Sequence, residues 1–453
     1  YADEVNYPNV AGFKWTEFGG GTNFVLIPAA STTIIDGTIA YSNYNIESIE
    51  SGEGADISNR QSEITGFNAG MNFTSFKGEN QTKFGFEILG FTTDFSFLNS
   101  VNQTVGQQQN TTELALYLQN RYNVGKFVIE PSFRVQYYAS LSTFSPEPRL
   151  GFKFNATKRL RIKGAGGFYS QNLISATSDR DVVNLFYGFL SGPDNLQDEI
   201  LNEDGSTTEV GAPLQLGRHA ILGFEYDVSR YLNINVEGYY KWFNQLTNLN
   251  RNKLYDENRV GGEIPDALKK DFIVETGNAY GVDFSAKYEK KQLSVSMVYS
   301  WSYVDRWDGI NRYNPIWDRR HNINLLGSYL FGEDQVWSFD ARWNLGSGFP
   351  LTQTTGFYEN IALQGNIGQD ITTQNGILGI QYGGLGEGRL PWYHRFDVSI
   401  KRKFFLTENS ILEATGSITN VYNRENIFYV NRVTNERVNQ LPFLPSIGIS
   451  LTF

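Results

Sequence analysis

The chain has 453 residues, a formal net charge of -10 and no cysteine. The absence of cysteine excludes disulfide scaffolds, thiol nucleophiles and cysteine metal sites, and the acidic balance argues against nucleic acid as a partner. The mean hydropathy of -0.36 leaves no apolar run for a transmembrane helix, but the strands of a membrane β-barrel carry a much weaker hydropathy signal. Aromatic residues at 15% together with 45 glycines are typical of all-β proteins with aromatic girdles and tight turns.

Alternating apolar and polar residues recur along the whole chain and predict about seventeen β-strands. The predicted strands of the first half are 16–29, 34–48, 63–76, 82–97, 112–123, 126–140, 147–155 and 159–171. In the second half the clearest are 232–242, 281–288, 293–302, 337–344, 395–401 and 446–453. In the last of these, Ile447 and Ile449 occupy one face, and Ser446 and Ser450 occupy the other. One apolar face and one polar face is the pattern of a strand between lipid and an aqueous lumen.

The links between the predicted strands tend to alternate in length. Short turns are expected at 77–81, 123–126, 155–159, 227–231, 289–292, 331–335 and 406–409. Longer links are expected at 98–111, 172–213, 247–272, 304–317, 348–390 and 424–440, with the link near 141–146 as an exception. Outer-membrane barrels have short periplasmic turns and longer extracellular loops. The pattern therefore predicts that Phe453 ends in the periplasm and that residues 1–14 belong to an extracellular loop.

The polar faces carry charged residues near the strand centres, whereas the apolar faces often end in Tyr or Trp, as an interfacial girdle requires. The sequence thus predicts an all-β fold, a transmembrane antiparallel β-barrel, with a large soluble all-β architecture as the alternative. Charged side chains are expected to face the lumen, where they meet water or a plug domain, because a charge near mid-bilayer costs roughly 2–4 kcal/mol. The main candidates for this lumen face are Glu130, Arg134, Arg149, Arg161, Asp283, Asp340, Arg342 and Asp397.

Aromatic residues in the long links are the best candidates for ligand contact. Flat rings bind sugars, siderophores and peptides by stacking and by burial of apolar surface. Packing within the loops and the interfacial girdle are the alternative roles for the same residues. The candidates are Phe186, Tyr187, Trp307, Tyr313, Trp317, Tyr382, Trp392 and Tyr393, and the links near 180–193, 304–317 and 380–393 are expected to converge over the barrel mouth.

No catalytic constellation stands out, and the chain is not expected to be an enzyme. The run from Asp318 to His321 could be read as acid–base residues, but a polar strand end at the lumen or rim is the favoured interpretation because positioned partners are missing. The acidic region 193–209 could hold calcium, although a solvated loop is favoured because the EF-hand spacing is absent. The three histidines are too scattered to suggest a metal cluster, so neither a metal site nor a cofactor is expected.

Several motifs together resemble a known family. They are Pro146–Gly151 followed by Leu160–Gln171, Trp317–His321, Leu390–Asp397, and Asn420–Arg424 with the terminal Phe453. In order and spacing the chain is similar to the barrel part of a TonB-dependent outer-membrane receptor of the Bacteroidetes type. This resemblance implies a 22-stranded outer-membrane barrel closed by an N-terminal plug domain, which imports a scarce nutrient driven by the TonB complex. The sequence contains no region that resembles the plug or the TonB box.

The expected organisation is a single β-barrel domain over residues 1–453, from which the plug and about five first strands are missing. An incomplete barrel would leave two unpaired strand edges in hydrocarbon. The expected partners are membrane lipid, a nutrient ligand such as a siderophore, glycan or peptide, a plug domain, the TonB complex and a surface lipoprotein. Two further hypotheses remain open, namely a passive porin-like channel and a structural or docking subunit of a larger surface complex.

Overall fold

The computed structural model describes residues 2–7, 11–29, 31–49, 59–98, 104–176, 186, 188–255, 264–360, 377–407 and 409–453. The first nine strands are β1 (Ala2–Tyr7), β2 (Ala11–Leu26), β3 (Thr33–Ile49), β4 (Asn59–Lys77), β5 (Asn80–Leu98), β6 (Thr104–Val124), β7 (Phe127–Tyr138), β8 (Thr143–Asn155) and β9 (Leu160–Gln171). Nine further long strands are β14 (Gln215–Ser229), β15 (Leu232–Leu249), β16 (Phe272–Lys290), β17 (Leu293–Trp307), β19 (His321–Phe331), β20 (Trp337–Gly346), β25 (Tyr393–Thr407), β26 (Ser410–Thr419) and β29 (Leu444–Thr452).

Shorter elements lie in the links between these strands. They are β10 (Leu173–Ala176), β11 (Gly188–Ser191), β12 (Glu199–Leu201), β13 (Thr207–Glu209), β18 (Arg312–Tyr313), β21 (Pro350–Leu351), β22 (Thr354–Asn360), β23 (Ile377–Tyr382), β24 (Gly388–Arg389), β27 (Ile427–Val430), β28 (Arg437–Asn439) and α1 (Asp266–Lys269). Within the described ranges, no helix has the length and apolar character needed to cross a membrane.

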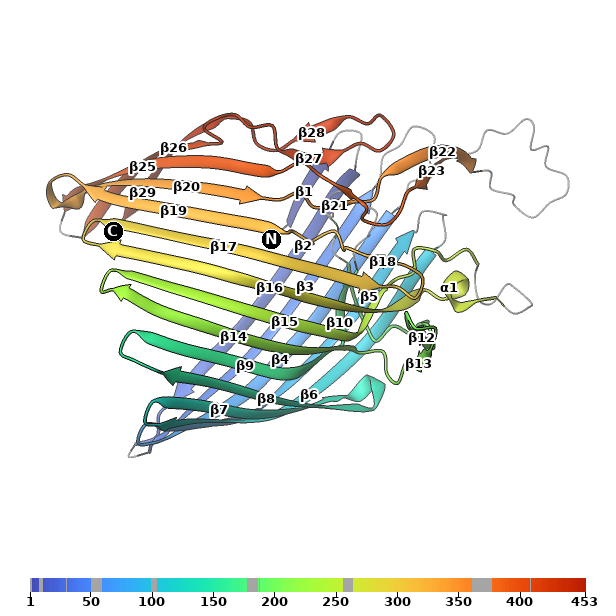
Figure 1. Ribbon diagram of the computed structural model, residues 1–453, viewed down its shortest axis with the longest axis horizontal. Coiled ribbons are helices and arrows are strands. Elements are labelled where there is room, and N and C mark those ends of the chain that lie inside the picture. Colours follow the sequence, from blue (N-terminus) through green and yellow to red (C-terminus); the bar gives the residue numbers. More distant parts are fainter. Residues whose placement is uncertain are drawn as a thin grey trace.

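The long strands form one 19-stranded antiparallel sheet, in which the two-residue β18 is counted. Each long strand pairs with its neighbours in chain order, from β1 to β9, then through β14–β17, β19, β20, β25 and β26 to β29. The sheet curls so that β2–β6 lie behind β14–β20, with the chain's C-terminus at the end that carries the short turns (Figure 1). Among the described residues, the ladders join β29 to β26 alone and do not join it to β1 or β2.

Two predictions about the first quarter of the chain are wrong. The described residues of the predicted loop 1–14 are strands instead, because β1 pairs with β2 from Ala2 opposite Thr16 to Tyr7 opposite Ala11. The link predicted at 98–111 is shorter, because β6 begins at Thr104 and pairs with β5 along its whole length. Both segments lack clear apolar alternation, and their strand structure comes from backbone pairing with a neighbour. The short turns are confirmed, and Gly78 and Gly125 occupy two of them with a positive φ, which glycine adopts without a steric penalty.

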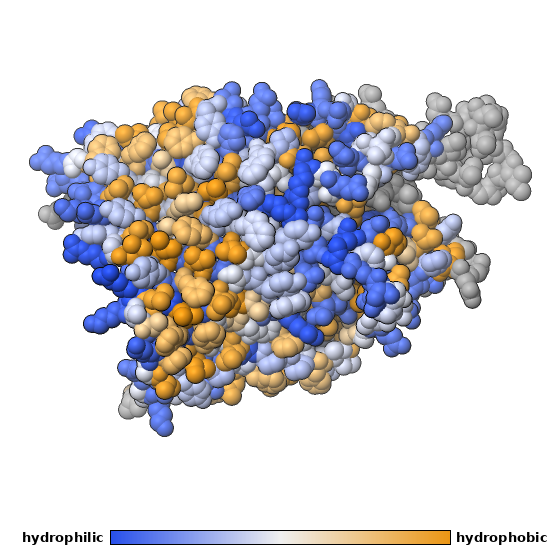
Figure 2. Space-filling view, viewed as in Figure 1, coloured by the Kyte–Doolittle hydropathy of each residue, from blue (hydrophilic) through white to orange (hydrophobic). Residues whose placement is uncertain are grey.

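The outer face of the sheet is apolar. Residues directly opposite each other in a ladder share a face, and the register places Tyr280, Val282, Phe284, Ala286 and Tyr288 of β16 on the outer face. Side chains of this kind stay exposed on many strands, as on β17, β20 and β29. Figure 2 shows them gathered mainly over the part of the wall nearer the short turns, whereas the end with the long links is mostly hydrophilic.

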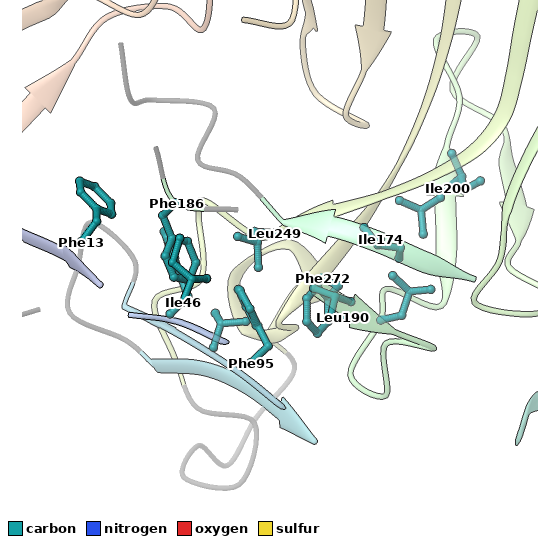
Figure 3. Close-up of a cluster of buried hydrophobic side chains, with 13 residues drawn as sticks. Phe13, Ile46, Phe95, Ile174, Phe186, Leu190, Ile200, Leu249 and Phe272 are labelled. Atoms are coloured by element: carbon teal, nitrogen blue, oxygen red, sulfur yellow. The ribbon is translucent and has the colours of Figure 1, made fainter. Parts of the chain in front are cut away.

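The buried core lies inside the curled sheet, at the end that carries the long links. It joins side chains of β2, β3, β5 and β6 to side chains of β15 and β16, with residues of the β9–β14 link between them (Figure 3). A soluble sandwich would bury apolar residues on facing sheets. Here the apolar outer face remains exposed, and the core is built from the inner face and from an inward-folded link.

Candidate functional site

The eight predicted lumen residues lie on one face of the sheet. The register is continuous across strands, as in the row in which Glu130 lies opposite Gly151 and, two strands further on, Ala165 lies opposite Ile221. The same rule places Arg342 opposite Asp397 on β20 and β25. This is the inner face, because it is the face that contacts the inward-folded link. Contact of these residues with a plug domain stays a prediction.

Ion pairs between side chains of the inner wall satisfy many of its charges. Arg161 of β9 reaches both Glu225 (2.8 Å) and Asp227 (2.7 Å) of β14, and Arg134 pairs with Glu87 at 2.9 Å. Arg149 pairs with the buried Glu147, Glu130 pairs with Arg121 at 3.3 Å, and Asp397 pairs with Arg395 at 3.0 Å. The pairs of Arg161, Arg134 and Glu130 join different strands, whereas those of Arg149 and Asp397 lie within one strand. All of them keep the charges away from lipid.

A cavity of about 410 Å³ opens on the inner face of β17–β26. Asp340, Arg342 and Asp397 line it together with Lys401 and a row of serine and threonine hydroxyls. Asp340 accepts hydrogen bonds from Ser328 (2.7 Å) and Ser338. The lining is largely polar, and the volume lies at the lower end of small-ligand pockets.

Two of the predicted ligand aromatics are buried. Phe186 belongs to the inner apolar core, and Tyr313 donates a hydrogen bond to Glu275 from a nearly inaccessible position. Tyr187 lies outside the described residues. For Phe186 and Tyr313 the structure therefore shows the alternative role, packing within the loops.

The other five aromatics lie at the rim. Trp307 donates its indole N–H to the backbone carbonyl of Leu201 at 2.6 Å, and Trp392 stacks on His321, which lies beside Trp301 on the outer face. Trp317 is 46% exposed with the Arg306 guanidinium 4.8 Å from its ring centre. Arg432 covers Tyr382, and Arg319 lies near Tyr393. Trp317 and Trp392 are thus about equally accessible, at 46% and 48% exposed. Ligand contact by these five aromatics stays a prediction.

A buried carboxylate that sequence reasoning missed organises one half of the rim. The side chain of Glu275 is inaccessible to solvent and receives hydrogen bonds from Arg251 (2.9 Å), Arg306 (3.1 Å) and Tyr313 (2.8 Å). Arg251 also pairs with Asp308. These residues come from the β15–β16 link, from β17 and from β18, so one carboxylate fixes three segments. Glu275 lies in β16, just after the predicted link 247–272. The sequence offered no signal for its role, because its partners are distant in the sequence.

Asp318 plays the same part in the other half. Its buried carboxylate accepts from Arg320 (2.7 Å), Arg389 (2.5 Å) and the backbone N–H of Val304 (2.9 Å). Arg389 also donates to the carbonyl of Gly348. Asp318 and Arg389 therefore connect the β17–β19 link, the β20–β21 link and β24.

Four of the six carboxylates of the acidic region 193–209 have separate partners, and the other two, Glu199 and Glu209, lie opposite each other in the β12–β13 ladder. Asp194 accepts from Gln109, Asp198 lies 3.9 Å from Lys270, and Asp204 accepts from Ser206 in a tight turn. Glu203 pairs with Arg312 at 2.7 Å, and this hydrogen bond lowers the pKa of the Glu203 carboxyl. No group of three metal-ligating side chains is found in the described ranges, so these residues hold loops together individually.

The rim links contact one another in a continuous series. The β12 region meets the 304–317 link through Trp307 and through the Arg312–Glu203 pair. The 314–320 segment meets Arg389, and Arg432 of the β27–β28 hairpin donates to the carbonyl of Thr352. The resulting rim surrounds the end of the sheet opposite the short turns, where β22 and β23 project (Figure 1).

No protein-family model matches the chain, and no curated protein matches it. Solved structures do. The FrpB iron transporter from Neisseria meningitidis is 12% identical with a TM-score of 0.63, and the match covers 98% of this chain and 63% of that chain. The outer membrane transporter YddB from Escherichia coli is 10% identical with a TM-score of 0.58, over 99% and 64%. The copper transporter OprC is 9% identical with a TM-score of 0.61, over 100% and 68%.

The class of structure follows from these matches. The chain has the antiparallel β-barrel fold of the outer-membrane transporters, which confirms the predicted fold class. It spans less than two thirds of the length of the FrpB and YddB chains.

Proposed function

We propose that the chain forms the barrel wall of an outer-membrane receptor that imports a scarce nutrient. The observation that carries this proposal is the combination of transporter fold, apolar outer face and polar inner face on the same strands. On β16, the interval from Tyr280 to Tyr288 corresponds to roughly 20 Å along the membrane normal, at about 3.4 Å per residue and a tilt of about 40°. This length suits the apolar band of an outer-membrane barrel.

Aromatic rings at both ends of this band support the membrane placement. Near the rim, Tyr280 stacks on Tyr240 (5.5 Å between ring centres) and on Tyr303 (5.2 Å). Near the short turns, Phe331 stacks on Trp337 at 6.0 Å. Tyr and Trp prefer the membrane–water interface because one end of the ring is apolar and the other is wet.

In its complete form, we propose, the receptor holds a plug domain against the charged inner wall and is energised through the TonB complex, as the sequence resemblance implies. Metal complexes are the first ligands to test, since FrpB is an iron transporter and OprC a copper transporter by their descriptions. Glycans and peptides are the next ligands to test. The rim aromatics would contact the ligand, and a surface lipoprotein would cover the rim.

The test is uptake by cells that carry the intact gene. The protein should appear in the outer-membrane fraction, and uptake of the ligand should stop when the proton-motive force is dissipated or the TonB complex is removed. Uptake that continues at an unchanged rate without that energy would indicate the alternative, a passive channel. Absence from the outer-membrane fraction would reject the membrane proposal itself.

A further inference from the structure

The link between β9 and β14 does not remain outside the rim. Its segment 188–201, called the inner strap from here on, contacts β4, β5 and β6 at one end and β16 at the other. In the sheet, β6 and β16 are separated by β7, β8, β9, β14 and β15. A segment that contacts both of these distant strands must cross the inside of the curled sheet from one wall to the other.

The first end of the inner strap is anchored by buried polar groups. The Ser191 hydroxyl lies 2.9 Å from the hydroxyl of Thr111 and 3.3 Å from that of Thr93. Gln107 donates to the carbonyl of Ser191 at 2.6 Å, and the backbone N–H of Phe189 donates to Ser62 at 2.8 Å. Because a buried polar group without a partner is costly, these matched groups fix the register of the strap on β4–β6.

The second end is held by backbone pairing. The N–H of Gln197 donates to the carbonyl of Phe272 at 3.0 Å, and the N–H of Phe272 donates to the carbonyl of Asn195 at 3.1 Å. A parallel bridge joins Leu196 to Phe272. Residues 195–197 of the inner strap therefore pair with the first residue of β16 as a short additional strand.

Between its two ends the inner strap is packed with apolar side chains. Leu190, Leu196 and Ile200 are all more than nine-tenths buried, in one cluster with Phe95, Phe97 and Val105 of the far wall and with Phe272 and Val274 of β16 (Figure 3). Inside an otherwise polar lumen, such a cluster excludes water from its sector. Closely packed interiors of this kind have few voids and low compressibility.

We propose that the inner strap is a fixed barrier that blocks one sector of the barrel mouth and confines solutes to the sector of β17–β29. That sector contains the cavity lined by Asp340, Arg342 and Asp397, so the passage it leaves admits polar and charged solutes. The barrier belongs to this chain and acts in addition to any plug domain. The inference rests on the proposed membrane-barrel function.

The first test is a disulfide between the strap and the wall. The chain contains no cysteine, so Thr111→Cys with Ser191→Cys gives a unique pair in the intact protein. The disulfide should form nearly completely in outer-membrane preparations and should leave energised uptake of the receptor's ligand unchanged, because the barrier does not move. The matched control combines Ser191→Cys in the strap with Ser417→Cys on the inner face of β26. This pair should not cross-link.

A locked protein that no longer takes up ligand would overturn the proposal, since the strap would then be a moving gate. Failure of the Thr111–Ser191 pair to cross-link would overturn the placement of the strap. A protein that never reaches the outer membrane fails earlier and counts against the proposed function instead, so the two failures are distinguishable.

The second test removes the barrier. Leu190→Asp with Leu196→Asp places two carboxylates in the apolar cluster, which should raise the population of the displaced strap by on the order of 100-fold. Because a plug domain would itself block the lumen, both proteins are compared as versions that lack the plug segment, and passive entry of a large hydrophilic dye into de-energised cells should then increase about tenfold or more. The control Leu201→Asp changes a partly exposed residue and should leave dye entry unchanged. Equal dye entry in the double variant and the unmodified protein, both assembled in the outer membrane, would contradict a barrier role.

Discussion

At the scale of single residues, two buried carboxylates determine how the rim is held. Glu275 and Asp318 each have an inaccessible side chain and two arginine partners. Both partners of Glu275 come from other segments, whereas Asp318 pairs with Arg320 of its own segment and with the distant Arg389. A buried carboxylate is tolerated only where charges and hydrogen bonds compensate its desolvation. Removing either the carboxylate or its arginine partners alone would therefore leave an uncompensated buried charge.

The first prediction concerns Asp318→Asn. The substitution leaves the guanidinium groups of Arg320 and Arg389 without their carboxylate, and breaking a buried pair destabilises a protein by about 3–5 kcal/mol. The temperature at which the heat-modifiable electrophoretic shift disappears should therefore fall. Glu289→Gln, at an exposed pair with Lys287, is the matched control and should change this temperature little. An unchanged transition temperature in Asp318→Asn would show that the ion pairs of Asp318 with Arg320 and Arg389 do not stabilise the rim.

The second prediction concerns ligand contact. Replacing Trp307, Trp317 and Trp392 together by alanine should weaken ligand binding, because each ring supplies apolar area at the rim. Trp317→Ala alone should account for most of the loss, since Trp307 is hydrogen-bonded to Leu201 and Trp392 stacks on His321. The measurement is the Kd for the ligand established by the uptake experiment. A triple variant with the Kd of the unmodified protein would remove these residues from the site.

At the scale of elements, alternation along a strand decides what each side chain meets. On β29, Ile449 is 74% exposed on the outer face, and Ser450 lies opposite Glu413 on the inner face. The third prediction is that Ile449→Arg impairs barrel assembly far more than Ser450→Arg. A charge on the lipid face costs about 2–4 kcal/mol near mid-bilayer, whereas an arginine at position 450 can pair with Glu413. Equal yields of the two variants in the outer membrane would contradict the assigned faces.

The β12–β13 hairpin is an element held in part by one exposed ion pair. Arg312 donates to Glu203 and lowers the pKa of that carboxyl. A carboxyl with a lowered pKa in the folded state stabilises the structure above its unfolded pKa of about 4.3, and this contribution is lost as the pH falls through the lowered value. The fourth prediction is that the hairpin loosens only below about pH 4, seen as faster amide exchange in residues 199–209. Arg312→Gln should show the faster exchange at neutral pH already; an equally protected hairpin in that variant would contradict the role of the pair.

At the scale of the whole molecule, the sheet has an edge on either side. The described ladders end at β1 and at β29, and an unpaired backbone group in hydrocarbon costs several kcal/mol. The fifth prediction is that both edges are paired in the membrane, by further strands of the complete receptor. The amides of residues 446–452 should then exchange as slowly as those of β26 in the intact, membrane-embedded protein. Exchange at the rate of the rim links would show that the β29 edge is open.

The sequence by itself determined the strands, their faces and most of their turns, because alternation with period two and glycine at tight turns are local properties. It predicted the charged inner face for the same reason. The tertiary structure alone decided that Phe186 packs inside the core, that the Gln- and Thr-rich start of β6 is a strand, and that Glu275 and Asp318 hold the rim. These features depend on partners far away in the sequence, such as Ser191 against Thr111 or Arg389 against Asp318. No local pattern records such pairs, since they exist only once the sheet has curled and brought distant strands to the same lumen.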